Sequence, residues 1–306
     1  MMRVHTLEDL DLSAPPGKRL VVLGDPIGHS LSPAMHNAAL AEMARTWPDL
    51  ADWRYEAVHV PADRIGPALR LLHAAGVRGV NLTIPHKVRV LEVLEEVDPV
   101  ARSMGAVNTL IRTDTGYRGT NTDGFGILKA MEEAFGRAPA GSDIWVFGAG
   151  GAARGIIIAC LGAGARRLSV VNRSVERLEE LEGDLRSQRM EGLERIRFIP
   201  LVGSPVDPDP GAVLINATSL GLKAEDPCPI GRGFLREEVV VYDTTYGVCN
   251  ELALACRKYH RPYADGLSML VWQGVRSLEI WTGKPVPAGC MRAAAEGELK
   301  ERKQNG

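Results

Sequence analysis

The stretch SDIWVFGAGGAARGIIIACL, residues 142–161, decides the fold of the second half of the chain. An apolar run typical of a buried strand leads into glycines, and a helical pattern follows from Ala152. Gly148, Gly150 and Ala153 fit G-x-G-x-x-A, which provides a tight turn, close backbone approach to a pyrophosphate and a small residue where helix meets strand. Amides at the helix start then face the phosphates. The stretch predicts a dinucleotide-binding unit; a glycine turn without a ligand is the alternative.

The next predicted strand indicates which dinucleotide is bound. It ends in Asn172-Arg173-Ser174, about 20 residues after the glycines, where an NAD-binding unit carries an acid for the ribose 2′-hydroxyl. No acid stands there. Arg173 and Arg177 instead offer planar guanidiniums, which suit a 2′-phosphate. The sequence favours NADP, although Ser174 as a helix cap with both arginines in solvent is compatible with the same residues.

Apolar runs and helical patterns alternate along nearly the whole chain. Strands are predicted at Leu20–Leu23, Tyr55–Val60, Gly79–Ile84, Ala106–Ile111, Ile144–Phe147, Leu168–Val171, Ile196–Ile199, Val213–Ile215 and Val239–Tyr242. Helices are predicted at Pro33–Ala44, Ile65–Ala75, Val88–Glu95, Phe125–Phe135, Ala152–Leu161 and Val175–Arg186, with two more in Gly266–Gly297. A hairpin-like turn, TDTG, is expected at residues 113–116. The alternation is typical of α/β proteins with parallel sheets covered on both faces.

Bulk composition excludes several classes of protein. The 306 residues, 45% of them hydrophobic, can fill the cores of two domains. With 36 Lys+Arg against 38 Asp+Glu, no net field favours nucleic acid or an anionic membrane. No signal core or membrane-spanning apolar run is present. The five cysteines form no CxxC pair, and their odd number argues against a disulfide framework. We therefore expect a cytoplasmic protein with reduced thiols.

A second informative stretch is NLTIPHK, residues 81–87. At strand spacing Asn81 and Thr83 face the same way, and Lys87 follows at the strand exit. This arrangement is either an ordinary polar strand end or one wall of a polar substrate pocket. His86 is expected at the rim of such a pocket.

A nicotinamide cofactor implies hydride transfer with a proton moved at the same time. Because the cysteines and histidines lack ligand spacing, no metal is expected, and the proton should pass through side chains. Lys87 and Asp123 are the candidates. A solvated Lys87 and an Asp123 that caps a helix are equally compatible with the local sequence.

An ordered series of motifs shows which family the chain resembles. They are VLGDPIGHSLSP, NLTIPHK, GAVNT, NTDG, GAGGAAR, NRSVERL, NATSLGL and DGLSMLVWQG. From about Arg19 to about Pro287 their order resembles that of shikimate dehydrogenases. The resemblance implies an N-terminal α/β substrate domain, a Rossmann-like NADP-binding domain, substrate in the cleft, and C-terminal helices that pack back on the first domain.

The predicted organisation follows from this resemblance. Residues 1–18 form an N-terminal extension, residues 19–122 and 265–306 the substrate-binding domain, and residues 123–264 the NADP-binding domain. The boundary is expected near Arg118–Gly124.

The resemblance also implies a role for each residue that matches a motif. Lys87 and Asp123 resemble the catalytic acid–base pair, with Lys87 favoured as the proton carrier. The residues that resemble substrate-binding groups are Ser30 and Ser32 for a carboxylate, Tyr246 near it, and Asn81, Thr83, Asn108 and Gln273 for ring hydroxyls. Those that resemble cofactor-binding groups are Gly148, Gly150, Gly151, Ala152, Asn172, Arg173, Ser174, Arg177, Thr218, Gly266 and Met269.

The chemistry suits these residue types. Ser32 precedes Pro33, so a carboxylate bound there also meets a helix N-terminus, whether or not Ser32 is an N-cap. Shikimate is a polyol, and amides and hydroxyls match it. We therefore expect reversible NADP-dependent reduction of 3-dehydroshikimate to shikimate, in the shikimate pathway, by a monomer or homodimer. The alternatives are a quinate/shikimate dehydrogenase that uses NAD or NADP, and a non-catalytic ligand sensor.

Overall fold

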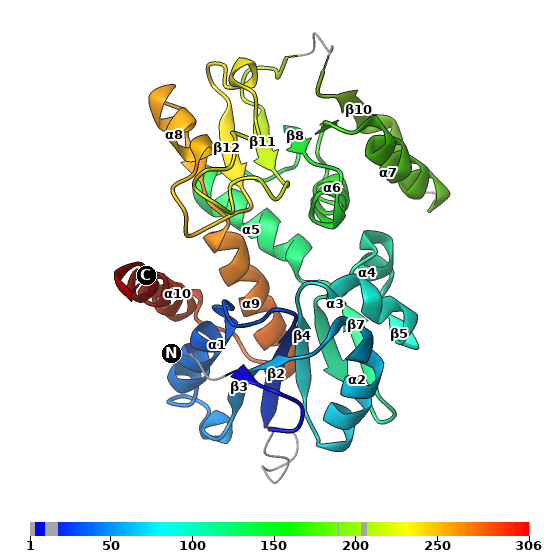
Figure 1. Ribbon diagram of the computed structural model, residues 1–306, viewed down its shortest axis with the longest axis vertical. Coiled ribbons are helices and arrows are strands. Elements are labelled where there is room, and N and C mark those ends of the chain that lie inside the picture. The colour runs from blue at the N-terminus through cyan, green and yellow to red at the C-terminus, as the bar shows by residue number, and fades with distance from the viewer. Residues whose placement is uncertain (1–3, 10–17, 189, 203–206, 306) are drawn as a thin grey trace. The chain divides into compact units, whose positions relative to one another are not determined.

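The computed structural model describes residues 4–9, 18–188, 190–202 and 207–305 (Figure 1). The chain packs as two compact units. Unit 1 comprises residues 1–122 and 271–306, and unit 2 comprises residues 123–270. The chain thus passes from unit 2 to unit 1 at residue 271, where the sequence prediction had placed the change at residue 265. In the described ranges, no helix has both the length and the apolar character that crossing a membrane requires.

Unit 1 contains a mixed sheet. Its strand order is β1-β3-β2-β4-β6-β7-β5. The strands are β1 Val4–His5, β2 Arg19–Gly24, β3 Arg54–His59, β4 Gly79–Leu82, β5 Glu96–Val97, β6 Thr109–Arg112 and β7 Tyr117–Thr120. All neighbours are parallel except that β6 is antiparallel to both β4 and β7. The antiparallel strand β6 departs from the parallel pattern that the alternation favoured, because the short Thr113–Gly116 turn, predicted as hairpin-like, reverses the chain directly into β7.

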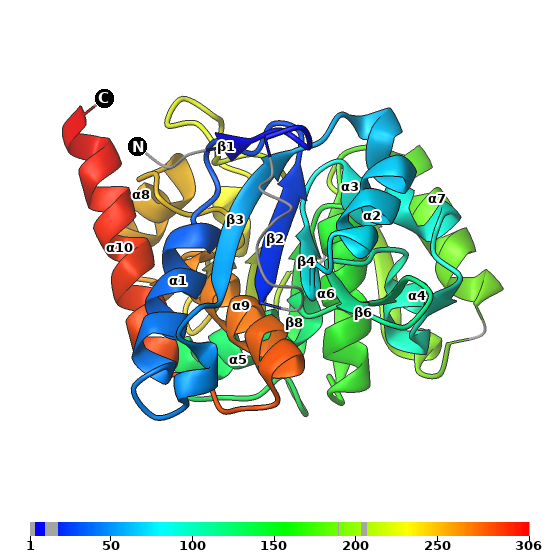
Figure 2. The same cartoon turned by 90° about the horizontal axis from the view of Figure 1, so that it is seen from below.

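The helices of unit 1 cover both faces of this sheet (Figure 2). They are α1 Ser32–Met43, α2 Ile65–Ala74, α3 His86–Arg89, α4 Pro99–Met104, most of α9 Leu267–Thr282, and α10 Ala288–Asn305. The C-terminal helix α10 packs beside α1, and Arg302 donates a 2.8 Å hydrogen bond to the carbonyl of His29. The expected return of the C-terminal helices to the first domain is confirmed.

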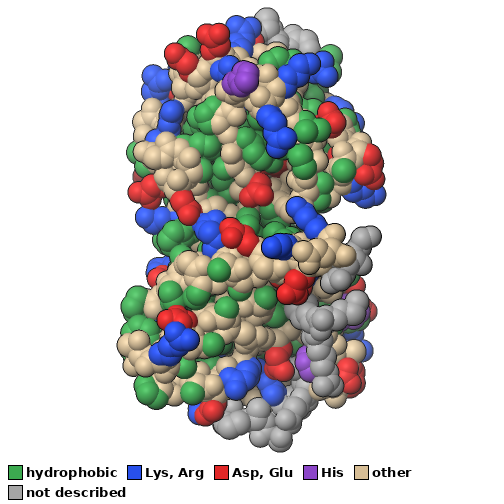
Figure 3. Space-filling view, turned by 90° about the vertical axis from the view of Figure 1, so that its left-hand side faces the viewer, with side chains coloured by type: hydrophobic (Ala, Val, Ile, Leu, Met, Phe, Trp, Pro, Cys, Tyr) green, Lys and Arg blue, Asp and Glu red, His purple; other side chains and the backbone are tan. Residues whose placement is uncertain are grey.

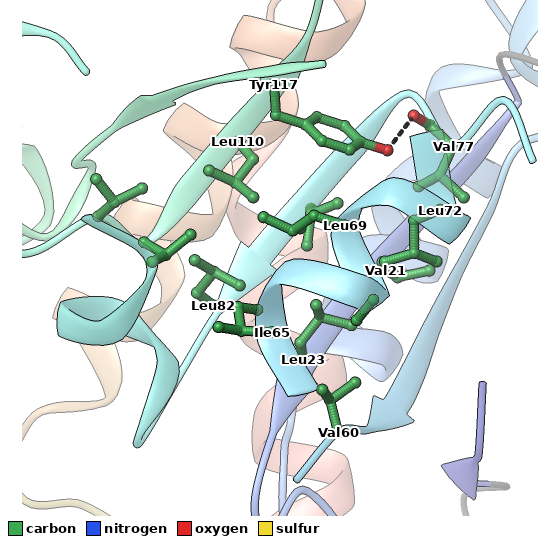
Figure 4. Packing of buried hydrophobic residues seen from close by; sticks show 14 of the residues in the cluster. Val21, Leu23, Val60, Ile65, Leu69, Leu72, Val77, Leu82, Leu110 and Tyr117 are labelled. Carbon is green, nitrogen blue, oxygen red and sulfur yellow. Dashed lines mark hydrogen bonds between the residues drawn. The ribbon is translucent and has the colours of Figure 1, made fainter. Parts of the chain in front are cut away.

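One core of unit 1 lies between α2 and the sheet (Figure 4). Ile65, Leu69 and Leu72 follow one another at helical spacing and are all buried. They meet Val21 and Leu23, alternate residues of β2 that face α2. Each such side chain stabilises the fold by roughly 1.5–3 kcal/mol relative to exposure.

Unit 2 contains a six-stranded parallel sheet, as the alternation predicted. Its order is β10-β9-β8-β11-β12-β13. The strands are β8 Asp143–Phe147, β9 Arg167–Asn172, β10 Ile196–Pro200, β11 Val213–Asn216, β12 Val240–Asp243 and β13 Tyr263–Ala264. The helices are α5 Asp123–Phe135, α6 Gly151–Gly162, α7 Val175–Ser187 and α8 Glu251–Lys258. Every strand pair is parallel, which is the arrangement of a Rossmann-like domain.

Several boundaries differ from the predictions. Strand β4 ends at Leu82 rather than Ile84, because Pro85 interrupts the strand and the His86 amide donates to the Thr83 carbonyl in a turn. Ile84 is consequently 74% exposed. The predicted extension at residues 1–18 lies partly outside the described residues. Within it Val4 and His5 form β1, which pairs with β3.

Charges of both signs are interspersed on the face drawn in Figure 3, with no large area of one sign. This distribution agrees with the near balance of 36 basic and 38 acidic residues. The face drawn has none of the single-sign fields that attract polyanions.

On the second face of the unit 1 sheet, Trp281 packs closely against Gly79. Trp281 of α9 is 2% exposed, its Nε1 donates to the Leu110 carbonyl at 2.9 Å, and its ring occupies the space where a Cβ on Gly79 would lie. Gly79→Ala is expected to lower the free energy of unfolding by about 1–3 kcal/mol through overpacking. Gly297→Ala, on an exposed part of α10 with open space around it, should instead stabilise by roughly 0.5–1 kcal/mol. Urea denaturation measures both, and an unchanged Gly79→Ala variant would contradict the packing argument.

Candidate active site

Polar side chains gather at one edge of the unit 1 sheet, where β4 ends and β6 begins. Asn81 and Thr109 are cross-strand neighbours in that sheet. The buried polar residues that share this edge are Ser32, Asn81, Asn108, Thr109, Thr122, Gln273 and Ser277. Because polar groups are costly to bury without partners, such a set needs mutual hydrogen bonds.

Asn81 is held by hydrogen bonds on both ends of its amide. Its Oδ1 accepts from the Tyr55 hydroxyl at 2.7 Å. Its Nδ2 lies 2.9 Å from the Asn108 carbonyl, and 3.1 Å from both Thr109 Oγ1 and Ser277 Oγ. Asn81 is 6% exposed, so its amide hydrogens are used inside unit 1.

Asn108 has a fixed amide orientation. Its Oδ1 accepts from the backbone N–H of Thr122 at 2.8 Å and from Thr109 Oγ1 at 2.9 Å. A backbone N–H can only donate, so Oδ1 and Nδ2 cannot be exchanged. Nδ2 donates to Thr122 Oγ1 at 3.0 Å and to Gln273 Oε1 at 3.4 Å. The structure therefore brings together Asn108 and Gln273, two predicted substrate-binding residues from distant parts of the sequence.

The start of α1 holds the two predicted carboxylate-binding serines. Ser32 is the first residue of α1, and the N-cap position belongs to Leu31, whose side chain makes no capping hydrogen bond. Ser30 Oγ accepts from the Ser32 amide at 3.2 Å. Because Ser30 already accepts from the Ser32 amide and Pro33 has no N–H, the attraction of this helix start for an anion comes mainly from the macrodipole.

The predicted proton carrier Lys87 lies in α3, immediately after the turn that ends β4. Its backbone carbonyl accepts from the Val107 amide at 2.8 Å, next to Asn108. Thr83 is half-buried at the end of β4. His86 is not a rim residue as predicted. It is fully buried, its Nε2 hydrogen-bonds the Val60 carbonyl at 2.8 Å, and burial lowers its pKa.

Asp123 is the first residue of α5 and belongs to unit 2, whereas Lys87 belongs to unit 1. The residue before Asp123 is Thr122, which Asn108 holds through the hydrogen bonds described above. The Nδ2 of Asn121 donates to the Ala106 carbonyl at 2.9 Å. The segment that leads into Asp123 is thus fixed against the segment before β6.

The glycine loop of unit 2 fits a dinucleotide pyrophosphate. Gly148 has φ +123°, and a Cβ on it would lie 2.9 Å from the Ala217 carbonyl oxygen, so only glycine suits this turn. Gly150 is the N-cap of α6 without a side-chain capping bond, and no atom lies within 4 Å of the Cβ positions of Gly150 and Gly151. Uncapped amides facing open space are what a phosphate group requires. Ala152 follows in the first turn of α6.

The predicted 2′-phosphate residues meet where β9 leads into α7. Ser174 is the N-cap of α7, and its Oγ accepts from the Arg177 amide at 3.3 Å. The Nδ2 of Asn172 donates to the Ser174 carbonyl at 2.9 Å. Arg173 and Arg177 are both exposed. The capping role that the sequence left open is real, and it leaves both guanidiniums in solvent at a helix start.

Asp243 is a site-organising residue that sequence reasoning missed. It lies at the end of β12 and is wholly buried. Its carboxylate accepts from Asn216 Nδ2 at 2.9 Å, from the Thr245 amide at 3.0 Å and from Asn250 Nδ2 at 2.8 Å. Asn216 in turn accepts from the hydroxyl of Thr218 at 2.7 Å. An acid directly after an apolar strand run was the available signal.

This cluster shapes the loops that carry the remaining predicted residues. Tyr246 is half-buried in the loop that Asp243 holds through Thr245. A Cβ on Gly266 would collide with the Thr244 carbonyl, so glycine is required there. The Met269 amide donates to the Tyr242 hydroxyl at 3.2 Å. Thr218, Tyr246, Gly266 and Met269 therefore sit on segments next to one carboxylate-centred network.

Comparison with known proteins shows which family the chain resembles. The family model described as "Shikimate dehydrogenase substrate binding domain" matches residues 22–110, and "Shikimate 5'-dehydrogenase C-terminal domain" matches residues 266–296. A shikimate dehydrogenase (NADP(+)) of Rubrobacter xylanophilus is 38% identical over 281 residues, covering 90% of this chain and 95% of that protein.

Solved structures give the same result. A shikimate 5-dehydrogenase of Thermus thermophilus in complex with NADP(H) and shikimate has TM-score 0.77 and 32% identity, covering 91% of this chain and 98% of that one. A shikimate 5-dehydrogenase of Listeria monocytogenes in complex with shikimate and NAD has TM-score 0.78 and 27% identity, covering 90% and 95%.

The buried histidine of α1 should make the free energy of unfolding depend on pH. His36 is fully buried, its Nδ1 donates to the Ser32 carbonyl at 2.8 Å, and burial lowers its pKa from 6.5 to about 4. The unfolded chain therefore binds this proton more tightly, and the stability involved is complete above pH 6.5 and lost as pH falls toward 4. The loss amounts to roughly 3 kcal/mol. His36→Phe should flatten the dependence of unfolding free energy on pH in this window, whereas exposed His29→Phe should not. A full slope in His36→Phe would contradict the assignment.

Proposed function

The chain belongs to the shikimate dehydrogenase family, and we propose that it catalyses the reversible NADP-dependent reduction of 3-dehydroshikimate to shikimate. The observation that carries the proposal is the 38% identity to an NADP-dependent shikimate dehydrogenase over 90% of this chain. That span includes both the polar edge of unit 1 and the glycine loop of unit 2.

The polar edge of unit 1 suits shikimate, which has one carboxylate and several hydroxyls on a ring. We assign the carboxylate to Ser30 and Ser32, where the start of α1 adds the positive end of the helix macrodipole. The ring hydroxyls are assigned to Thr83, Asn108 and Gln273.

Two further assignments complete the substrate site. Tyr246 is assigned a place near the carboxylate. Asn81 is assigned with Asn108 to the ring hydroxyls, and its amide also holds its neighbours in place.

The cofactor site follows the loops of unit 2. Bound NADPH supplies the hydride that reduces the carbonyl carbon. The pyrophosphate is assigned to Gly148, Gly150, Gly151 and Ala152, and the 2′-phosphate to Asn172, Arg173, Ser174 and Arg177. Thr218, Gly266 and Met269 are assigned to the rest of the cofactor.

The proton is assigned to Lys87. Its ammonium hydrogen-bonds the substrate carbonyl oxygen, stabilises the negative charge that develops there, and donates the proton that completes the hydroxyl. Asp123 orients this ammonium and accepts a hydrogen bond from the hydroxyl formed. In the reverse direction Lys87, as the neutral amine, takes the proton back.

We place the enzyme in the cytoplasm as a monomer or homodimer. The five cysteines are all free thiols, which is the state that reducing compartments maintain.

The experiment that tests the function is an initial-rate assay followed by nicotinamide absorbance, with shikimate and quinate each paired with NADP and with NAD. Fast turnover only with shikimate and NADP is expected. The Listeria complex contains NAD, so comparable rates with NAD would move this enzyme to a less discriminating branch of the family. NADP binding without turnover of either substrate would support the ligand sensor instead.

Lys87→Ala is expected to lower kcat about 10²–10⁴-fold, the usual contribution of general acid–base catalysis. The KM for NADP should stay unchanged, because the assigned cofactor residues lie elsewhere. Lys129→Ala, which removes a surface lysine paired with Glu132 at 2.8 Å, is the matched control and should retain activity. Full turnover by Lys87→Ala would exclude the assigned mechanism.

Arg173→Ala is expected to raise the KM for NADP roughly tenfold, since a charge-assisted hydrogen bond to phosphate contributes about 1.5–3 kcal/mol. The KM for NAD should not change, because NAD has no 2′-phosphate. Arg186→Ala removes a guanidinium from the far end of the same helix α7 and serves as control. Equal effects on both cofactors would place the 2′-phosphate elsewhere.

A further inference from the structure

We propose that Tyr55 is a positioning residue for the substrate, whose hydroxyl holds Asn81 and, through it, the hydroxyl-binding Asn108. The inference rests on the proposed function and adds to it a residue that contacts neither substrate nor cofactor. Tyr55 lies in β3, is 1% exposed, and donates to Asn81 Oδ1 at 2.7 Å.

The ring of Tyr55 stacks on the histidine that holds Ser32. The rings of His36 and Tyr55 are 4.0 Å apart and 13° from parallel. His36 Nδ1 donates to the Ser32 carbonyl at 2.8 Å. Burial raises the pKa of Tyr55 well above its usual value. The Tyr55 hydroxyl thus keeps its proton, which it donates to Asn81.

From Asn81 the hydrogen bonds continue to the other end of the site. Asn81 Nδ2 donates to the Asn108 carbonyl and reaches Thr109 Oγ1, and Thr109 donates to Asn108 Oδ1 at 2.9 Å. The Tyr55 hydroxyl is therefore linked to a residue assigned to the ring hydroxyls of shikimate, while the Tyr55 ring stacks on the histidine that holds Ser32. A phenylalanine would fill the same apolar space, so the buried hydroxyl is retained for its hydrogen bonds rather than for packing.

Tyr117 provides a matched control in the same sheet. It is 6% exposed, and its hydroxyl donates to the Val77 carbonyl at 2.8 Å. It lies in β7 beside the hairpin turn, at the end of the strand opposite Thr120. Tyr117→Phe and Tyr55→Phe each remove one hydroxyl from a buried ring, so they should lower the thermal midpoint by comparable amounts.

The test is to measure KM for shikimate and for NADP in both variants. Tyr55→Phe should raise the KM for shikimate about five- to tenfold, with kcat and the KM for NADP retained, and Tyr117→Phe should leave all three unchanged. Half-maximal thermal stabilisation of Tyr55→Phe by shikimate should require correspondingly more ligand.

The outcomes separate this inference from the proposed function. If the unchanged enzyme turns over shikimate but Tyr55→Phe and Tyr117→Phe share one KM for it, the positioning role is overturned and the function stands. If the unchanged enzyme neither binds nor turns over shikimate, the proposed function fails, and this inference fails with it.

Discussion

The buried amide of Asn81, near the end of the central strand β4 of unit 1, is the constraint on which the site depends. A buried amide is costly unless its donors and acceptor find partners, so the surrounding residues must supply hydroxyls and carbonyls in fixed places. Tyr55, Thr109 and Ser277 provide them from β3, β6 and α9. These partners come from three separate stretches of sequence, and the network joins those elements at one edge of the sheet. The same hydrogen bonds therefore stabilise this edge of the sheet and hold the residues of the polar site in place.

Unit 2 uses the same principle with a carboxylate in place of an amide. Asp243 is buried at the end of β12 and organises the loops that follow β11 and β12. In α/β sheets ligands bind beyond the carboxyl ends of the strands, where loops would otherwise be mobile. Fixing several loops to one buried acid makes their geometry depend on hydrogen bonds rather than on loop length.

The sequence predicted most of this architecture, and its failures have physical causes. Long runs such as β8 and α6 carry enough periodicity and glycine pattern to be read directly, and the parallel sheet of unit 2 followed from them. Strands β1, β5 and β13 have two residues each, too few to show a period of two. The antiparallel β6 depended on the pairing of its hairpin, which residue patterns near the turn only hinted at. His86 was misjudged because a short polar helix looks exposed, while its burial is decided by contact with Val60. Direct roles for Lys87, Asp123 and the substrate ligands remain predictions.

The hairpin of β6 and β7 also has a geometric consequence. The chain leaves the polar edge at Thr109, reverses at Thr113–Gly116 and returns to the same edge at Thr120, two residues before Thr122. The length and register of the paired strands therefore determine where α5 begins. Because side chains alternate between faces, a slip of one residue in this pairing would turn the side chains of β7 to the opposite face and displace Asp123 by the length of a residue. The turn itself can vary in length during evolution, since it lies at the opposite end of both strands, but the register cannot.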